Sequence, residues 1–243
     1  GFRSRALYQL TLQGQDTKIR LSWWHAWTLW WQGFPDQALE RARQALAHSQ
    51  QSTHPFEKSW ALMIPASVHI LRREPAAGEM DMAAAVRLAR EHEFGFFKLY
   101  MPCIQAELFT QQGRPREAVA AIQKCRPAGL ATGAQFLDTL IVTFLANAYL
   151  ALGEIDAGLA AADEGLSIAE RNGEYFAAPE LHRLKGELLL LQRSPASVSE
   201  AEAAFSGALD TARAQGSKAL ELRAATSLAR LWQSQGKRKE AHE

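Results

Sequence analysis

The stretch from Gln135 to Gly173, QFLDTLIVTFLANAYLALGEIDAGLAAADEGLSIAERNG, decides the fold of this chain. It predicts a helix from about Gln135 to Leu152, a turn at Gly153-Glu154-Ile155-Asp156, and a second helix from about Ala157 to Arg171. Asn172-Gly173 then ends the second helix, because glycine accepts the left-handed backbone that commonly closes a helix. The unit is therefore a helical hairpin.

This hairpin is one copy of a repeat with a period of 40 residues. Three sets of positions keep that period: Ala26, Ala66, Ala106, Ala146 and Gly186; Gly33, Arg73, Gly113, Gly153 and Arg193; and Pro35, Pro75, Pro115, Ile155 and Pro195. A fixed period over most of a chain predicts a stacked array rather than one central core. The prolines suit the first position of a helix, where a missing N–H leaves no bond unmade.

Small residues recur on the second helix as well, at Ala38, Gly78, Ala118 and Gly158 and again at Ala45, Ala85, Cys125 and Gly165. Small residues at both contact points let helices approach closely, as in tetratricopeptide (TPR) repeats. We therefore predict an all-α fold, a TPR-type α-α superhelix (solenoid) of about six helix pairs. A unit of this length also falls in the range of HEAT-type pairs, but the small residues and the Gly-x-Pro turn favour lengthened TPR helices.

We predict a single repeat domain over residues 1–243. Its repeats lie near 16–53, 54–93, 94–133, 134–173, 174–216 and 217–243, the last one truncated, and residues 1–15 form part of an upstream helix. In the last repeat the pattern shifts by three residues, so that Ala229, Trp232 and Gly236 replace Gly186, Leu189 and the turn glycine. We attribute the shift to a longer turn at Ser194–Ser199. Because Gly1 is not methionine, we expect a segment of a longer protein.

Composition excludes several classes of function. The net charge is +1, from 27 basic and 26 acidic residues, and no basic stripe suits a phosphate backbone, so we expect no nucleic-acid partner. No apolar run approaches the roughly 18 residues that span a bilayer, so we expect no membrane partner. Cys103 and Cys125 lack metal-ligand spacing and suit apolar packing in a reducing compartment. We predict a cytoplasmic location, with no metal and no cofactor.

Catalytic motifs are also missing from the sequence. It contains no Gly-x-Ser-x-Gly, His-Glu-x-x-His, Cys-x-x-Cys or phosphate-binding Gly-x-x-x-x-Gly-Lys-Ser/Thr pattern. None of the seven histidines has another histidine four residues away. We therefore predict that the chain is not an enzyme.

Candidate binding residues follow from the repeat, because the inner faces of the first helices line a concave groove in arrays of this type. The candidates are Trp23, Trp27, Trp30, Trp60, Met63, Tyr100, Glu107, Asn147, Arg183, Glu187 and Arg230. They are aromatic and apolar toward the N-terminus and charged, with both signs, toward the C-terminus. This gradient fits an extended peptide or protein segment with aromatic anchors at one end and charge-assisted hydrogen bonds at the other.

Alternatives remain open for these residues. The N-terminal tryptophans have a second interpretation, packing against an upstream repeat or domain. Arg183, Glu187 and Arg230 also fit a salt-bridged ladder between adjacent helices. Asn147 is the strongest single candidate, because an amide on an inner helix face has few roles other than hydrogen bonding.

Two prolines fall inside predicted first helices, at Pro65 and Pro102. Each predicts a kink, because proline removes a helix hydrogen bond and clashes with the preceding turn. The kinks either adjust the curvature of the array or widen the groove into a pocket near Trp60 and Tyr100.

Three segments resemble a bacterial family: WWQGFPDQAL at residues 30–39, ELHRLKGELLL at 180–190, and residues 201–241 with LELRAATSLARLW at 220–232. The family is the C-terminal TPR region of large bacterial signalling proteins. In these, an adenylate or guanylate cyclase or a DNA-binding domain precedes a STAND-type ATPase. The resemblance covers nearly the whole chain and is most specific over residues 179–243. It implies a sensor or regulatory arm of an output domain, without cyclase or ATPase activity in this chain.

The predicted function is therefore a protein- or peptide-binding module in bacterial signal transduction. Its partner is a protein or peptide segment, which includes another domain of the same parent chain, and self-association is compatible with the sequence. Two alternatives are a small-molecule sensor with a pocket in the superhelix and a structural arm that oligomerises or autoinhibits the parent protein. A deep apolar pocket would favour the sensor.

Overall fold

The computed structural model describes residues 17–131 and 137–237, together with Lys239 and Ala241. Throughout these residues the chain is helical, without strands, as predicted. The helices are α2 (Thr17–Trp31), α3 (Pro35–Ser49), α4 (Pro55–Arg72), α5 (Pro75–Glu91), α6 (Gly95–Gln111), α7 (Pro115–Ala131), α8 (Asp138–Leu152), α9 (Ile155–Asn172), α10 (Ala178–Leu191), α11 (Pro195–Ala214) and α12 (Lys218–Ser234). A 3₁₀ turn at Tyr175–Ala177 precedes α10. The predicted upstream helix at residues 1–15 lies outside the described residues.

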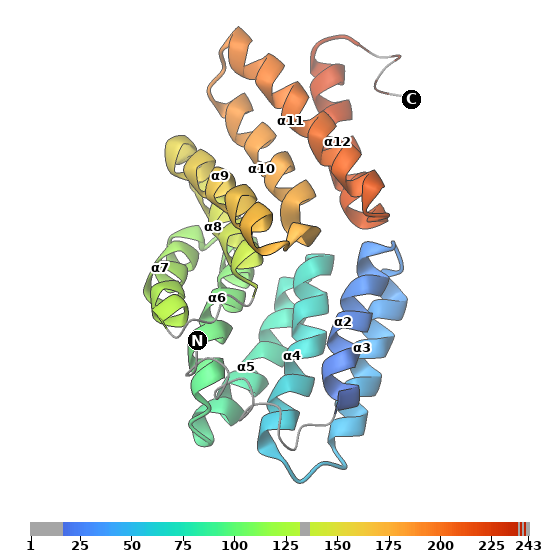
Figure 1. The fold of residues 1–243 in the computed structure, drawn as a ribbon, viewed down its shortest axis with the longest axis vertical. Coiled ribbons are helices and arrows are strands. Elements are labelled where there is room, and N and C mark those ends of the chain that lie inside the picture. Colours follow the sequence, from blue (N-terminus) through green and yellow to red (C-terminus); the bar gives the residue numbers. More distant parts are fainter. Residues whose placement is uncertain (1–16, 132–136, 238, 240, 242–243) are drawn as a thin grey trace. The chain divides into compact units, whose positions relative to one another are not determined.

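The chain divides into two compact units. The described part of unit 1 is residues 17–30 and 34–131, and that of unit 2 is residues 31–33 and 137–237 with Lys239 and Ala241. In unit 1, α4 contacts α3, α5 and α6, and α6 contacts α7; in unit 2, α10 contacts α8, α9, α11 and α12. Helices therefore pack as adjacent pairs within each unit, consistent with an α-solenoid (Figure 1).

The hairpin quoted above forms as predicted in its described part. Helix α8 ends at Leu152, and Gly153 has a φ of 73°. Helix α9 starts at Ile155, two residues before the predicted Ala157, and ends at Asn172 with Gly173 at a φ of 70°. The earlier start follows the repeat, because α3, α5, α7 and α11 begin with the prolines that occupy the same position.

The turn between the helices of a pair has the same backbone geometry in every repeat. The residues at the glycine position of the turn have left-handed φ angles: Gly33 90°, Arg73 59°, Gly113 77°, Gly153 73°, Arg193 55° and Gly236 78°. In most of these turns the next amide donates to the carbonyl five residues earlier, as from Glu154 to Tyr149 (3.0 Å) and from Lys237 to Trp232 (2.9 Å). This is the Schellman motif. It confirms that Trp232 and Gly236 occupy the shifted positions of the last repeat.

The predicted longer turn at Ser194–Ser199 is wrong. Helix α11 begins at Pro195 and is 20 residues long, so the additional residues lengthen the helix. Ser194 caps it, because its hydroxyl accepts from the Ser197 amide while the Ser197 hydroxyl accepts from the Ser194 amide. Three extra residues are close to one helical turn of 3.6, so the buried face of the helix stays nearly aligned.

Small residues mark the close contacts between helices, as predicted. Ala26, Ala66, Ala106 and Ala146 have no exposed surface. A Cβ added to Gly78 would lie 2.9 Å from Leu108, one added to Gly158 would lie 2.6 Å from Leu188, and one added to Gly165 would lie 2.8 Å from Leu181. In each case a second helix, α5 or α9, approaches the first helix of the next pair at a distance that only glycine allows.

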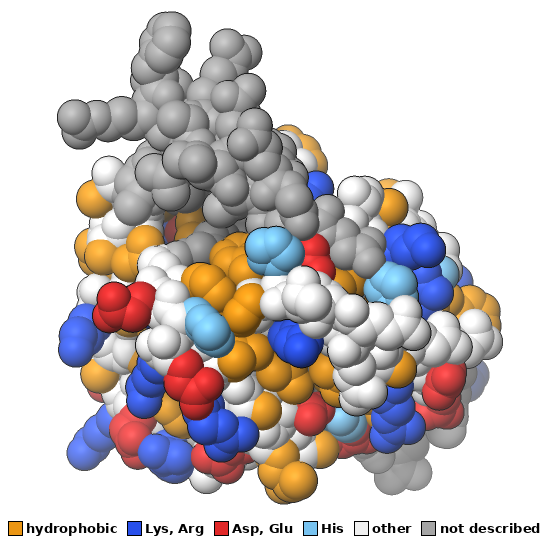
Figure 2. All heavy atoms as spheres, turned by 90° about the horizontal axis from the view of Figure 1, so that it is seen from below, with side chains coloured by type: hydrophobic (Ala, Val, Ile, Leu, Met, Phe, Trp, Pro, Cys, Tyr) orange, Lys and Arg blue, Asp and Glu red, His pale blue; other side chains and the backbone are white. Residues whose placement is uncertain are grey.

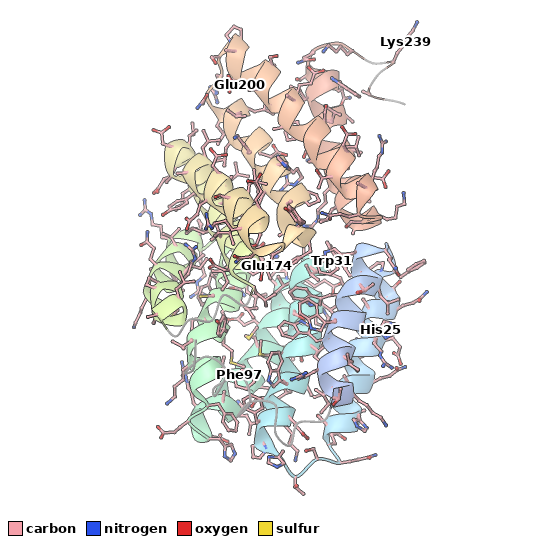
Figure 3. The ribbon with its side chains drawn as sticks, viewed as in Figure 1. His25, Trp31, Phe97, Glu174, Glu200 and Lys239 are labelled. Atoms are coloured by element: carbon pink, nitrogen blue, oxygen red, sulfur yellow. The ribbon has the colours of Figure 1, made fainter. Side chains whose placement is uncertain are left out.

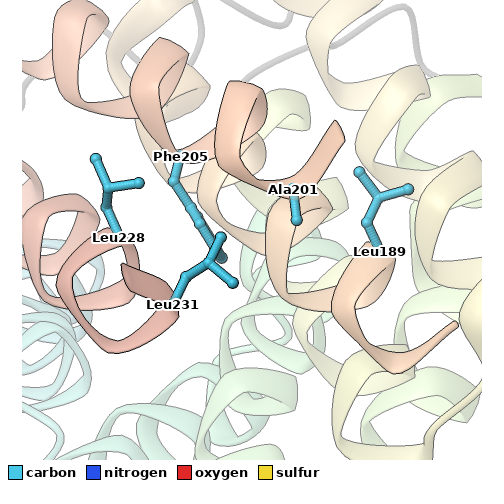
Figure 4. Close-up of a cluster of buried hydrophobic side chains, with 5 residues drawn as sticks. All are labelled: Leu189, Ala201, Phe205, Leu228 and Leu231. Atoms are coloured by element: carbon cyan, nitrogen blue, oxygen red, sulfur yellow. The ribbon is translucent and has the colours of Figure 1, made fainter. Parts of the chain in front are cut away.

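A hydrophobic cluster joins α10, α11 and α12 in unit 2. It consists of Leu189, Ala201, Phe205, Leu228 and Leu231, each at most 5% exposed (Figure 4). The fully buried ring of Phe205 lies at its centre. Burial of these side chains stabilises the fold, because removing apolar surface from water contributes roughly 25 cal/mol per Å².

Pro65 and Pro102 lie inside continuous helices, α4 and α6, as predicted. The kink expected at each proline stays a prediction. Cys103 is buried and Cys125 is half-buried, and both are free thiols. Burial raises the pKa of the Cys125 thiol and outweighs the opposite effect of the positive charge of Lys124.

Candidate functional site

The aromatic residues predicted for one end of the groove form a cluster of edge-to-face and tilted rings in unit 1. The ring of Trp23 lies 5.3 Å from that of Trp27 and 4.8 Å from that of Trp60. Trp60 in turn lies 5.6 Å from Phe97 of α6, and Figure 3 labels Phe97. Trp23, Trp27 and Trp60 are at most 9% exposed. The structure thus brings these predicted residues together across α2 and α4, where they contact one another.

A hydrogen bond between residues 40 positions apart connects α2 to α4. The indole Nε1 of Trp27 donates to Oγ of Ser67 over 2.8 Å, and that hydroxyl donates to the carbonyl of Ile64. Buried indole N–H groups generally need such a partner. The remaining predicted residues of this end, Trp30, Met63 and Tyr100, are also buried.

Glu107 takes part in a contact between α4 and α6. It is 7% exposed, and its Oε1 accepts from Nε2 of Gln111 over 3.0 Å. The same amide donates to the carbonyl of Ile70 on α4 over 2.9 Å. Glu107 therefore lies beside the contact between α4 and α6, which are the first helices of two neighbouring pairs.

In unit 2, Arg183 forms a charge network on α10. Its Nη2 and Nε donate to the two carboxylate oxygens of Glu180 over 2.8 and 3.0 Å, and its Nη1 donates to Oε1 of Glu187 over 3.1 Å. Burial opposes the charge of Arg183, but the two carboxylates outweigh it and raise the pKa of the guanidinium. All three of its nitrogens are engaged, so Arg183 orients the carboxylates.

Helix α12 completes this network. Oγ of Ser227 donates to Oε1 of Glu187 over 2.7 Å, and Nη1 of Arg223 lies 3.5 Å from Oε1 of Glu180. Two carboxylates therefore face two guanidinium groups, and their formal charges cancel. Arg183 and Glu187 form an ion pair within α10 and not the predicted ladder between adjacent helices. The ion pair that joins α12 to α10 is that of Arg223 with Glu180, and Arg230 lies exposed on α12.

Three polar residues spaced 40 apart occupy neighbouring first helices: Asn147 on α8, Glu187 on α10 and Ser227 on α12. We call them the polar row. Helix α10 contacts both α8 and α12. Asn147 and Glu187 are half-buried and Ser227 is buried. The row thus combines an ordered carboxylate with accessible surface.

A cluster that sequence reasoning missed surrounds His69 in unit 1. This ring is 8% exposed, and its Nδ1 and Nε2 lie 2.6 Å from Glu74 and 3.7 Å from Asp81. Arg72 bonds both Glu74 and Asp36 of α3. Burial alone would raise the pKa of Glu74, but hydrogen bonds from His69 and Arg72 lower it; for Asp81, burial prevails and raises the pKa. The signal was a histidine where other repeats carry Leu29, Phe109, Tyr149 and Leu189.

Among the described residues, no group of three or more His, Cys, Asp or Glu side chains could hold a metal ion. No helix in that part of the chain has the length and apolar character needed to cross a bilayer. Basic and acidic side chains are interspersed with hydrophobic ones on the face shown in Figure 2. The surface there is mixed in character.

No protein-family model matches the chain, and no curated protein matches it.

Proposed function

We propose that the chain is a TPR-type module that binds a protein or peptide segment and acts without catalysis or a cofactor. In this proposal it is the cytoplasmic sensor or regulatory arm of a larger bacterial signalling protein. The family resemblance of residues 179–243 supports the regulatory role. The partner is a protein or peptide, and neither nucleic acid nor a membrane takes part.

The polar row is the observation that carries the binding function. Glu187 is held by Arg183 and Ser227, so little conformational entropy is lost when its remaining lone pairs accept a bond from a partner. Asn147, one repeat away, is half-buried, and its side-chain amide contains both donor and acceptor atoms. A peptide backbone needs this combination, because each residue presents one N–H and one C=O.

The structure changes the residues best used to test the groove. Arg183 is only 8% exposed and forms ion pairs with two carboxylates, so its removal would disturb the fold. Asn147→Ala combined with Glu187→Gln alters the row while leaving Arg183 in place. Asp156→Ala, at an exposed position of α9, is the matched control.

The test is capture from native bacterial lysate, followed by titration of the captured protein against each variant. A partner that binds wild type and the Asp156→Ala control alike, but binds the row variant at least about tenfold more weakly, supports the proposal. A partner that binds all three equally, or capture of none, contradicts recognition through the polar row. Equal unfolding temperatures would show that the variants remain folded.

A further inference from the structure

The polar row contains a carboxylate whose two oxygens are used unequally. Oε1 of Glu187 accepts from Nη1 of Arg183 over 3.1 Å and from Oγ of Ser227 over 2.7 Å. Among the residues that the structure describes, none donates a hydrogen bond to Oε2. The side chain of Glu187 is 30% exposed. One carboxylate oxygen therefore holds the group in place, and the other can accept a bond from a partner.

The positive charge of the network on α10 and α12 is concentrated on a different carboxylate. Glu180 receives two hydrogen bonds from Arg183, over 2.8 and 3.0 Å, and Nη1 of Arg223 lies 3.5 Å from it. Glu187 receives one hydrogen bond from Arg183 and one from a neutral hydroxyl group. Its negative charge is therefore the less compensated of the two. Charge-assisted hydrogen bonds are about twice as strong as neutral ones, so Oε2 favours a cation over a neutral donor.

A group with the opposite requirement lies further along α12. Arg230 follows Ser227 by three residues, so the two side chains leave the same side of the helix about one turn apart. Arg230 is exposed, and it forms no hydrogen bond or ion pair with another described residue. Because Ser227 contacts Glu187, the row presents a negative group from α10 and a positive group from α12 beside each other.

The distance between neighbouring helices determines how far apart the complementary charges of a partner lie. The axes of packed helices are about 8–10 Å apart, and an extended chain advances about 3.3 Å per residue. In an extended segment that crosses α10 and α12, the residues that face the two helices are therefore about three positions apart.

We infer that the segment bound by the polar row carries a lysine or arginine that pairs with Oε2 of Glu187, and an aspartate or glutamate about three residues away that pairs with Arg230. This inference rests on the proposed function, because it names the chemistry of the partner that the row binds. The basic residue contributes more to the affinity than the acidic one. Its partner is half-buried and already held in place, whereas an exposed ion pair contributes little.

The test is a selection of peptides from a random library displayed on phage, with the full chain immobilised. The same library is screened against Glu187→Gln and Arg230→Gln. Glutamine keeps an oxygen that can accept the two bonds made to Glu187, and it removes only the charge. The matched controls are Glu200→Gln on α11, labelled in Figure 3, and Arg116→Gln on α7, which remove the same charges at exposed positions of second helices.

We expect wild type and both controls to enrich peptides with a basic and an acidic residue about three positions apart. Glu187→Gln should lose the preference for the basic residue, and Arg230→Gln should lose the preference for the acidic one. In fluorescence anisotropy, Glu187→Gln should bind the best-enriched peptide about tenfold more weakly than wild type, the scale of a hydrogen bond to a charged group. Arg230→Gln should bind it about threefold more weakly, as for an exposed ion pair.

A change in the peptide tests the same contact without altering the protein. Replacement of the basic residue of that peptide by glutamine should weaken its binding to wild type about tenfold. The same replacement should leave binding to Glu187→Gln nearly unchanged, because the charged contact is already absent there. Equal unfolding temperatures will show that the protein variants are folded.

The outcomes separate this inference from the proposed function. If the selected peptides depend on Asn147 and Glu187 but show no preference for a basic residue, the inference is wrong and the proposed function stands. The inference is also wrong if the glutamine peptide loses as much affinity for Glu187→Gln as for wild type. If wild type selects no peptide that the variant with Asn147→Ala and Glu187→Gln fails to bind, both are contradicted.

Discussion

A methyl group added to Gly186 would lie 2.4 Å from Cε1 of Phe205, which belongs to the next helix and has no exposed surface. The ring has no free space to move into, because Leu189, Leu228 and Leu231 surround it. The contact between α10 and α11 therefore depends on the absence of a side chain at residue 186.

Gly186→Ala should lower the free energy of unfolding by about 1–3 kcal/mol, the range for inserting a methyl group into a packed core. Gly207→Ala is the control, because its Cβ would meet no atom within 4 Å and alanine is the better helix former. We expect Gly207→Ala to raise stability by up to about 1 kcal/mol. Urea denaturation measures both, and a neutral Gly186→Ala would contradict the close contact.

Arg73 and Arg193 occupy the turn position where other repeats have glycine, with φ angles of 59° and 55°. Left-handed backbone costs a residue with a side chain roughly 1–2 kcal/mol. Arg73→Gly and Arg193→Gly should therefore each stabilise the protein, by up to about 1 kcal/mol once the greater freedom of glycine in the unfolded chain is subtracted. Thermal unfolding checks this, with Gly153→Ala as the converse change that should destabilise. Lower melting temperatures for both glycine variants would refute the strain.

Arg183→Ala should be strongly destabilising. It leaves Glu180 and Glu187 without their shared guanidinium, and removal of one partner from a buried ion pair costs about 3–5 kcal/mol. Lys218→Ala removes a charge from an exposed pair with Glu221 and should cost less than about 1 kcal/mol. Urea denaturation measures the free energy of unfolding of both variants. If the two lose similar amounts, the buried network stabilises the protein no more than an exposed ion pair does.

His182 makes stability depend on pH. Burial, followed by the nearby charge of Lys185, lowers its pKa below the ordinary value of 6.5. The unfolded chain then binds this proton more readily than the folded chain, so the contribution of His182 to stability is present above pH 6.5 and is lost as the pH falls below it. We expect the unfolding midpoint of wild type to decline as the pH falls from 6.5 to 5, and His182→Gln should make this decline less steep. An unchanged slope would assign the decline to other groups.

The turns and close contacts could be predicted from the sequence because their requirements are local. Gly153, Gly173 and Gly236 follow from backbone geometry, and Gly158 and Gly165 follow from the repeat. The missed lengthening of α11 has a simple cause: Ser-Pro-Ala-Ser favours turns and caps alike. Only the reciprocal bonds of Ser194 and Ser197 distinguish the two.

The environments of the candidate residues were harder to predict, because they depend on neighbouring helices. Glu180 and Glu187 are three and four residues from Arg183, so the ion pairs on α10 had a sequence signal. The contacts of Arg223 and Ser227 with them did not. The repeat likewise places Trp23 and Trp27 on one face of α2 but does not reveal that Trp60 and Ser67 meet them there. His69 reaches Asp81 only because the hairpin brings α5 back beside α4.

The hydrogen bonds from Trp27 to Ser67 and from Ser227 to Glu187 each connect residues 40 positions apart. Bonds of this span connect a helix pair to its neighbour and to nothing further along the chain. When a mechanical force pulls the ends of the chain apart, each unit should yield one hairpin at a time. Every such event would release about 40 residues, or roughly 130–140 Å of contour length. Because repeat arrays are stabilised by nearest-neighbour contacts, the protein would extend under load as a series of short, recoverable steps.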